Sequence, residues 1–496
     1  MRDILLLFVC LLVLSPAVLA TNRYVNAGDP LQTVINEAAR GDVITLQAGA
    51  TFTGTFTLPM KSGTGSIVIE SSMMTSLPGA GQRVNPSHAK LMARLISPNS
   101  GPALRALSGA HNYIIRGLEM ASAPGIYSGG IVLLGFKETQ ISDVPYSITL
   151  DRVYIHGDPV IGGKRGIALN SRYTNIWNSY ISDIKSTWQE AQAIGGWNGP
   201  GPFQIINNYV EASTENIMFG GAPSSMPNLV PTNILIRHNH VYKPLSWKSD
   251  DPTYAGTPWL VKNLLELKNA SDVTVEGNVF ENCWPMGQSG FAVVFTVRTQ
   301  GDLMPWAVVQ NVTFRNNIVR NANNGVNMLG ADPIYGGVTR NITIRNNLFE
   351  KINKIFVQIL HDCASTVIDH NTVLHGDGFL VDFDGPASTG FVYQNNIAAR
   401  GYYGIVGGGT AEGLRTLLHY APGGIVRRNV VAGASAGMYP PDNFFPASID
   451  AVQFVDFFGG NYALAATSPY LTAGIYGKPL GVDFTALNAA TANAAP

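Results

Sequence analysis

Charged side chains are scarce in this chain of 496 residues: Asp, Glu, Lys and Arg supply 13% of them, about half of the share that soluble domains usually carry. The two signs nearly cancel, with 32 basic against 33 acidic residues, so no net field attracts a nucleic acid or an anionic membrane surface. We therefore expect no nucleic-acid partner. The hydrophobic share of 46% excludes a disordered chain, and the 53 glycines, together with many asparagines, indicate turns and side-chain amides rather than salt-bridged helices.

Cysteine and long apolar runs are also rare. Of the three cysteines, Cys10 lies in the N-terminal apolar run, so only Cys283 and Cys363 fall in the body of the chain. Two cysteines do not make a disulfide framework, and we expect both to be buried free thiols, with a pairing across the fold as the alternative. No apolar segment after the N-terminus approaches the length that spans a bilayer.

The N-terminus has the pattern of a secretory signal. Arg2 precedes an apolar run from Ile4 to Val13, and the small residues Val18 and Ala20 follow it. A run this short is typical of a signal peptide rather than of a membrane span. We expect cleavage near Ala20 and a mature chain from Thr21 that is secreted to the extracellular space or the periplasm without a transmembrane segment. An uncleaved anchor is the alternative.

One phrase recurs along the chain. It alternates apolar and polar residues with period two and then places an Asn before a second short apolar pair, as in Asn341–Phe349 (NITIRNNLF). This pattern predicts a short strand, a tight corner and a second strand in each copy. Eight copies carry the Asn anchor, at Asn208, Asn239, Asn278, Asn317, Asn347, Asn371, Asn396 and Asn429. Three weaker copies lie around Gly117, Arg152 and Ser179.

The spacing of the anchors varies from 24 residues (Asn347 to Asn371) to 39 residues (Asn239 to Asn278). A varying step with a fixed anchor is typical of a solenoid whose coils share one cross-section and differ in the length of their loops. When coils stack at about 4.8 Å, each Asn amide can bond to the Asn above and below it. We therefore interpret the Asn row as a structural ladder and not as a catalytic feature.

In its repeat and its two ends the sequence resembles the right-handed parallel β-helix proteins of the pectin-lyase-like group. Asp29–Ala39 (DPLQTVINEAA), with Asp29 as an N-cap and Pro30 at the first helical position, looks like the family's capping helix. Asn461–Leu464 (NYAL) looks like its closing segment. The resemblance implies an all-β fold, a right-handed parallel β-helix with an N-terminal capping helix and an internal Asn ladder.

The resemblance also suggests how the chain divides. The expected parts are the signal peptide (1–20), the N-terminal cap and first coils (21–110), the β-helix repeats (111–435) and the C-terminal cap and tail (436–496). The Ala-rich residues after Phe484 are expected to be loose.

Aromatic residues gather in the loops of the two longest steps. The first loop, Leu245–Lys262, contains Trp247, Tyr254 and Trp259. Rings beside a solenoid face suit stacking on sugars, so we predict that these three side chains bind a polysaccharide; the alternative is that they pin the loop to the solenoid. A similar cluster on an earlier coil contains Trp188, Gln189, Glu190, Gln192 and Trp197.

Alternation also indicates which strand residues near these loops face outward. Leu265 and Leu267 are expected to point inward, so Glu266 and Lys268 point outward. Thr296 and Arg298 share a face in the same way. Later strands place further polar residues on the corresponding outer face: Asn327, Gln358, Asp382 and Asp384. We predict a groove in which Asn327, Gln358 and Asp382 bind substrate, with an ordinary solvated face as the alternative.

The stretch from Glu266 to Arg298 resembles, more weakly, the sites of the β-helical polysaccharide lyases that include chondroitinase B and alginate lyases. The resemblance implies that Lys268 is the base, that Arg298 is the acid or charge stabiliser, and that Glu266 is a ligand of a calcium cofactor. A hard cation neutralises a uronate carboxylate, which makes the neighbouring C5 proton easier to remove. The bland alternative is an exposed pair of Glu266 and Lys268 that contributes under about 1 kcal/mol.

Three functions stay open on the sequence alone. The first is β-elimination in an acidic polysaccharide by a monomeric secreted lyase. The second is a secreted protein that binds a glycan or another surface without turning it over. The third is a glycoside hydrolase whose paired carboxylates are Asp382 and Asp384, with His361 or Asp362 one coil away. Catalysis itself is therefore undecided.

Overall fold

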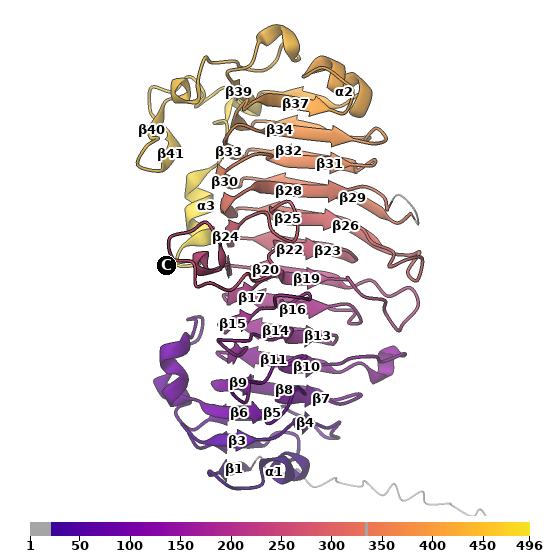
Figure 1. The fold of residues 1–496 in the computed structure, drawn as a ribbon, viewed down its shortest axis with the longest axis vertical. Helices are drawn as coiled ribbons and strands as arrows, with labels where there is room; N and C mark the ends of the chain where they lie inside the picture. Colours follow the sequence, from indigo (N-terminus) through magenta and orange to yellow (C-terminus); the bar gives the residue numbers. More distant parts are fainter. Residues whose placement is uncertain (1–20, 333–335) are drawn as a thin grey trace, which may run out of the picture.

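The chain winds into a parallel β-helix whose coils stack along one long axis (Figure 1). The computed structural model describes residues 21–332 and 336–496, so the expected signal peptide and its cleavage after Ala20 lie outside the described residues. Within those residues, three parallel sheets contain 14, 13 and 12 strands, and one antiparallel pair of strands lies near the C-terminus. The all-β solenoid predicted from the repeat is confirmed.

Each complete coil contributes one strand to each sheet, and the coils at the two ends are incomplete. The first sheet contains β1 (Asn22–Val25), β2 (Val43–Leu46), β5 (Ile67–Ser71), β8 (His111–Arg116), β11 (Tyr146–Asp151), β14 (Arg172–Trp177), β17 (Phe203–Ile206), β20 (Thr232–Arg237), β23 (Ala270–Glu276), β26 (Val308–Arg315), β29 (Val338–Arg345), β32 (Ala364–Asp369), β35 (Val392–Gln394) and β38 (Ile425–Arg427). The second sheet contains β3 (Thr51–Thr53), β6 (Ala93–Ser97), β9 (Leu118–Ser122), β12 (Tyr154–His156), β15 (Tyr180–Ile184), β18 (Tyr209–Ala212), β21 (His240–Tyr242), β24 (Val279–Cys283), β27 (Ile318–Ala322), β30 (Leu348–Ile352), β33 (Thr372–His375), β36 (Ile397–Ala399) and β39 (Val430–Ala432). The third sheet contains β4 (Phe56–Leu58), β7 (Leu104–Ala106), β10 (Val132–Leu134), β13 (Arg165–Leu169), β16 (Gln192–Gly196), β19 (Glu215–Phe219), β22 (Asn263–Leu267), β25 (Phe291–Thr296), β28 (Asn324–Leu329), β31 (Val357–Leu360), β34 (Phe379–Asp384) and β37 (Tyr403–Gly407).

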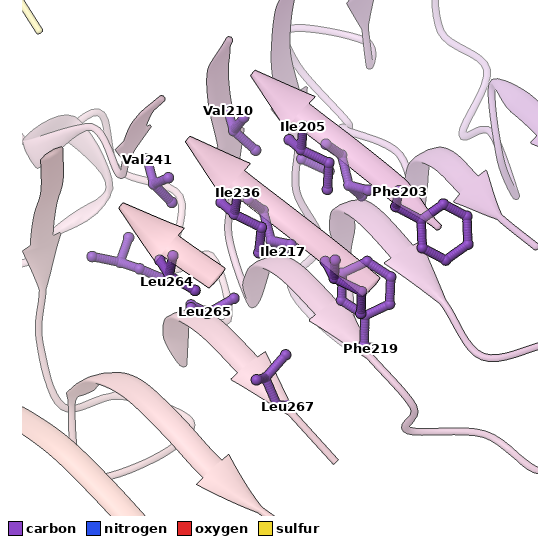
Figure 2. Close-up of a cluster of buried hydrophobic side chains, with 14 of the residues drawn as sticks. Phe203, Ile205, Val210, Ile217, Phe219, Ile236, Val241, Leu264, Leu265 and Leu267 are labelled. Carbon is purple, nitrogen blue, oxygen red and sulfur yellow. The ribbon is translucent and has the colours of Figure 1, made fainter. Parts of the chain in front are cut away.

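The core is a column of apolar side chains that point inward from all three sheets. In the first sheet, Ile205 of β17 lies beside Ile236 of β20, and both are fully buried. Figure 2 shows them facing Leu265 of the third sheet across the interior. Because the alternate residues of each strand stack on their counterparts in the next coil, every coil adds buried apolar area. Each such side chain contributes about 1.5–3 kcal/mol.

A tight corner joins the first sheet to the second in each coil. The residue before each ladder Asn has a positive φ, for example 53° at Asn346 and 54° at His370. This left-handed conformation turns the chain within one residue, and Asn and His are among the residues that tolerate it. The repeated sequence motif therefore contains a corner residue, which is followed directly by the ladder Asn.

The eight anchors stack as predicted. Asn347, which is fully buried, accepts bonds at Oδ1 from the backbone nitrogen and Nδ2 of Asn317, at 2.9 and 3.1 Å. Its own Nδ2 donates to the carbonyl oxygen of Phe314 (2.9 Å) and to Oδ1 of Asn371 (3.0 Å). The ladder has one more rung than the sequence indicated, because Asn429 donates from Nδ2 to Asn443 at 2.9 Å.

Helices cover both ends of the solenoid (Figure 1). At the N-terminal end, the predicted capping helix is α1 (Leu31–Glu37), which buries Leu31 and Ile35. The expected N-cap role of Asp29 is wrong: the helix begins one residue later, after Pro30, and the Asp29 carboxylate instead accepts a bond from the backbone nitrogen of Asn26. At the other end, α2 (Leu414–Tyr420) packs beside β37.

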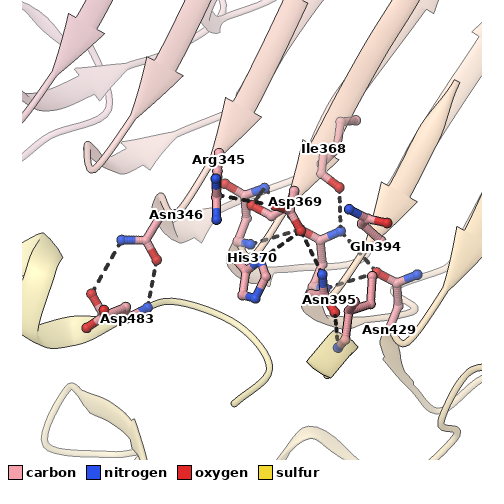
Figure 3. Close-up of polar contacts among 12 residues, drawn as sticks. Arg345, Asn346, Ile368, Asp369, His370, Gln394, Asn395, Asn429 and Asp483 are labelled. Carbon is pink, nitrogen blue, oxygen red and sulfur yellow. Dashed lines mark hydrogen bonds and ion pairs between the residues drawn. The ribbon is translucent and has the colours of Figure 1, made fainter. Parts of the chain in front are cut away.

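The residues after Phe484 are not loose, contrary to expectation. They form α3 (Phe484–Thr491), which buries Leu487 and runs back along the solenoid beyond the β40 (Phe454–Asp456) and β41 (Asn461–Leu464) pair. The backbone nitrogen of Asp483 donates to Oδ1 of the corner residue Asn346 at 2.7 Å (Figure 3). The carbonyl oxygen of Ala494 accepts a bond from Arg83, far back in the sequence, at 3.1 Å.

Cys283 and Cys363 are buried free thiols, as expected. Within residues 21–332 and 336–496, no helix has the length and apolar composition that a membrane crossing requires.

Candidate active site

A row of polar side chains crosses the outer face of the third sheet. Strand register places Glu266 beside Val294, which lies beside Asn327, and Gln358 and Asp382 follow on the next two strands. Asn327 Nδ2 donates to Gln358 Oε1 at 2.7 Å, and Gln358 Nε2 donates to Asp382 Oδ2 at 2.8 Å. The common outer face predicted from alternation is therefore confirmed for these residues.

A groove of about 330 Å³ opens on this row. Its walls are Glu266, Gln288, Ser289, Phe291, Val294, Thr296, Arg298, Asn327 and Gln358. The structure thus brings together Glu266, Arg298, Asn327 and Gln358, which the sequence proposed for one site, whereas Asp382 lies on the next strand and Lys268 is not among the lining residues. A larger depression of about 620 Å³ lies under the C-terminal segment, but its polar residues Arg345 and His370 are already paired with Asp369. The smaller groove is the better candidate.

Lys268 and Arg298 lie on neighbouring coils at the same end of the third sheet. Lys268 follows β22 directly, and its carbonyl oxygen accepts a bond from the backbone nitrogen of Arg298 at 3.0 Å. Its ammonium is 3.3 Å from Glu266 Oε1, and its side chain is 15% exposed. Gly220 leaves room for this arrangement, since a Cβ there would lie only 3.0 Å from the Cβ of Lys268. Arg298 lines the groove itself, and Lys268 is joined to it through the carboxylate of Glu266, which also lines it.

Glu266 is a buried carboxyl group, with 2% of the residue exposed. Burial raises its pKa above the ordinary value, and the ammonium of Lys268 opposes that shift only in part. Asn263 Nδ2 donates to Glu266 Oε2 at 3.3 Å and to Gln288 Oε1 at 3.2 Å. The buried surroundings therefore favour the protonated form of Glu266 more than water would. The interpretation of Glu266 and Lys268 as an exposed pair is wrong, because other side chains cover the Glu266 carboxylate on the outer face of the sheet.

Sequence reasoning missed a buried charge network on the coils before the groove. Gln192 Nε2 donates to Glu215 Oε2 at 2.9 Å, and Arg165 donates to Gln192 Oε1 at 2.8 Å. The ammonium of Lys262 pairs with Glu190 and lies 3.4 Å from Glu215 Oε1. Glu190 and Gln192 stood out in the sequence, but nothing there linked them to Lys262, which lies in a later coil.

The expectation that Trp247 and Trp259 offer open faces to sugars is wrong. Each is only 6% exposed, and their rings lie 6.4 Å apart in a buried cluster with Val261 and Trp284. The ammonium of Lys185 lies over both rings, 5.6 and 4.9 Å from the centroids. These tryptophans pin their loop to the solenoid, and the half-buried Tyr254 belongs to the same loop.

The exposed aromatic group near the network is Trp188, which is 71% exposed. Tyr127 lies beside it with a centroid distance of 5.8 Å, and the Tyr127 hydroxyl accepts a bond from Gln189 at 3.0 Å. The loop of Trp188 is joined to the long loop, because the backbone nitrogen of Leu260 donates to the carbonyl oxygen of Ser186 at 2.9 Å. This ring has the open face that Trp247 lacks.

The alternative pair of carboxylates lies beyond the groove. Asp382 is held by Gln358, and burial raises its pKa. Asp384 is exposed and accepts a bond from the backbone nitrogen of Gly385 at 2.9 Å. His361 and Asp362 form a left-handed turn after β31 and do not line the groove.

Calcium fits this donor set poorly. Glu266 already faces the ammonium of Lys268, and Glu190 and Glu215 face that of Lys262. Within the described residues, no group of three or more His, Cys, Asp or Glu side chains is placed to hold a metal ion. A divalent cation would have to displace one of two ammonium groups from its carboxylates.

The fold and its ladder define a right-handed parallel β-helix. Residues 263–416, which include the groove, match the family described as "Right handed beta helix region". No curated protein sequence matches this chain.

Solved structures share the fold at low sequence identity. The PL6 family alginate lyase AlyGC is 10% identical with a TM-score of 0.52, over 96% of this chain and 59% of that lyase, so this chain spans well under two thirds of its length. The Dettilon tailspike protein is 12% identical with a TM-score of 0.48, over 78% and 69% of the two chains. A mannuronic acid specific family 6 polysaccharide lyase from human gut microbiota is 9% identical with a TM-score of 0.44, over 86% and 87%. At these identities the likeness concerns the fold.

Proposed function

We propose that this protein is a polysaccharide lyase that cleaves an acidic polysaccharide by β-elimination. The observation that carries the proposal is the groove on the third sheet that Arg298 and buried Glu266 line, with the ammonium of Lys268 3.3 Å from Glu266 Oε1. The alginate lyase with the same fold supports only the point that a β-helix of this kind can carry a lyase site. Action on an extracellular polymer requires export, which agrees with the secretory signal expected at residues 1–20.

The residues present suit the proton transfers of an elimination. Arg298 is placed to bind the uronate carboxylate and to stabilise the negative charge that develops on it. Lys268, as a neutral amine, takes the C5 proton; the C4–C5 double bond forms as the C4–O4 bond breaks, and the departing oxygen takes a proton from Arg298 or from water. Lys268 must first release its own proton, and Glu266 Oε1, 3.3 Å from the ammonium, is placed to receive it.

The row beyond this pair is suited to hold further sugars of the chain. Asn327 and Gln358 offer amide groups, and Asp382 continues the row one coil further on. At the other end, exposed Trp188 gives a face on which a sugar ring can stack. A polymer laid along the solenoid would thus meet contacts on both sides of the reacting sugar.

The test is incubation of the purified protein with alginate, pectate, chondroitin, dermatan and hyaluronan, and with neutral glycans as controls. Ultraviolet absorbance from unsaturated ends on one of the acidic polymers is the expected result. New reducing ends without that absorbance would instead favour hydrolysis by Asp382 and Asp384. Binding without cleavage would favour a non-catalytic glycan-binding protein.

A further inference from the structure

Lys262 places a positive charge inside a group of carboxylates next to the groove. Its ammonium pairs with Glu190 and lies 3.4 Å from Glu215 Oε1, and its side chain is 15% exposed. Glu215 is fully buried, so its charge has little access to water and depends on such a partner. Asn263, which directly follows Lys262, connects this group to Glu266 through a bond of 3.3 Å.

The cation at this position is permanent. Burial alone would lower the pKa of Lys262, but the carboxylates of Glu215 and Glu190 raise it above its ordinary value. The ammonium therefore stays charged through the neutral range. The carboxylates of Glu190 and Glu215 that would attract a metal ion from solution already have this partner.

Resting on the proposed function, we propose that Lys262 is the cation that this site provides in place of a metal ion, so that uronate cleavage here needs no calcium. An ammonium group and a divalent cation both bind carboxylate oxygens, and both offset negative charge beside a uronate. Lys262 directly precedes the strand that carries Glu266, and Arg298 lines the groove together with Glu266, so both cations belong to the chain itself.

Two buried oxygen atoms show how the site would change without this ammonium. Glu215 Oε1 and Asn263 Oδ1 accept no hydrogen bond from the described residues. Removal of the Lys262 charge would leave the carboxylates of Glu190 and Glu215 without their shared cation, and carboxylate oxygens are ligands that calcium prefers. A neutral residue at position 262 should therefore create an affinity for calcium that the natural chain lacks.

The first experiment measures calcium binding without any substrate. Isothermal titration calorimetry and thermal melting with calcium chloride are applied to the natural chain, to Lys262→Met and to Lys248→Met, a control in the same loop. We expect no binding heat and no melting shift for the natural chain and the control, and both signals for Lys262→Met. Calcium binding by the natural chain, or none by a folded Lys262→Met protein, would overturn the proposal.

The second experiment applies once an acidic substrate is known. Excess EDTA should leave the rate of unsaturated-product formation unchanged, while Lys262→Met should lower kcat/KM at least tenfold and Lys262→Arg should retain most of it. Loss of activity in EDTA with recovery in calcium would refute the role of Lys262 and keep the lyase function. Absence of unsaturated product from every polymer would refute the lyase function, and the calorimetry would still decide the question of calcium.

Discussion

The backbone nitrogen of Arg298 donates a hydrogen bond to the carbonyl oxygen of Lys268, 3.0 Å away. The three strands β23, β24 and β25 separate the two residues in sequence, but the winding of the solenoid places them on adjacent coils. Their side chains can therefore act on the same sugar. The proposed chemistry depends on this adjacency, because an elimination needs the base and the charge stabiliser within reach of one residue of the polymer.

Replacement of the proposed base should separate binding from turnover. In Lys268→Ala we expect kcat on an active polyuronate to fall by about 10²–10⁴-fold, since general base catalysis contributes on that order. Substrate affinity should change little, because the base acts mainly in the transition state. Initial rates from ultraviolet absorbance and binding by calorimetry measure the two effects. Lys90→Ala, an exposed lysine far from the groove, is the control, and an equal loss there would count against a specific role.

Arg298 should not tolerate a change to lysine. Arg298→Lys keeps the charge but loses the flat fork that binds a carboxylate through two parallel hydrogen bonds. We expect a fall in kcat/KM of at least about tenfold, which corresponds to the loss of one charge-assisted hydrogen bond. The variant is compared with the natural chain on the same substrate, and near-normal kcat/KM would show that only the charge matters.

The ladder should be sensitive to the loss of a single amide. Asn347→Leu leaves the backbone nitrogen of Asn317 and the carbonyl oxygen of Phe314 without partners, and we expect a loss of about 3 kcal/mol in the free energy of unfolding. Asn36→Leu, on the exposed side of α1, should change it by less than about 0.5 kcal/mol. Urea unfolding measures both, and similar losses would contradict a special role for the ladder.

The aromatic residues should divide into structural and binding groups. Trp259→Ala should lower the free energy of unfolding by about 3–5 kcal/mol, because it empties a buried site. Trp188→Ala should leave the melting temperature unchanged and weaken binding of a retained glycan about tenfold, if stacking contributes about 1–1.5 kcal/mol. Melting curves and affinity electrophoresis distinguish the two groups. A stability loss in Trp188→Ala would assign that ring to the scaffold as well.

Stability should depend on the ionisation of Glu211 on the second sheet. Its buried carboxylate accepts bonds from the Tyr209 hydroxyl and the backbone nitrogen of Asp183. Burial and the negative charge of the Asp183 side chain raise its pKa from 4.5 to about 7. Because the folded state holds this proton more tightly than the unfolded state, stability contributed by protonated Glu211 is lost as pH rises from about 4.5 through 7, by about 3 kcal/mol. Denaturant unfolding across this range should show the slope in the natural chain, and Glu211→Gln should flatten it.

The repeat could be predicted because each coil repeats a corner and a ladder residue at the same place. The ladder residue Asn443 could not be predicted, because it follows Asn429 by only 14 residues and is not preceded by the alternating apolar and polar pattern of a strand. The outward face of Glu266 followed from period two, but its burial did not, since the covering side chains come from other coils. Whether Trp259 is open or buried depends on how a long loop folds back, and period two carries no information on that point. The partners Lys262 and Glu190 lie 72 residues apart, and no local pattern joins them.

The return of the C-terminal segment along the solenoid bears on the order in which the protein folds. In a solenoid each coil contacts its neighbours, so early coils can form while later ones are still being synthesised. In this protein, Arg83 binds the carbonyl oxygen of Ala494, and Asn346 accepts a bond from the backbone nitrogen of Asp483. Both bonds join an earlier coil to residues that are synthesised much later. Residues 483–494 can make these bonds only after all the coils between them and Arg83 have been synthesised.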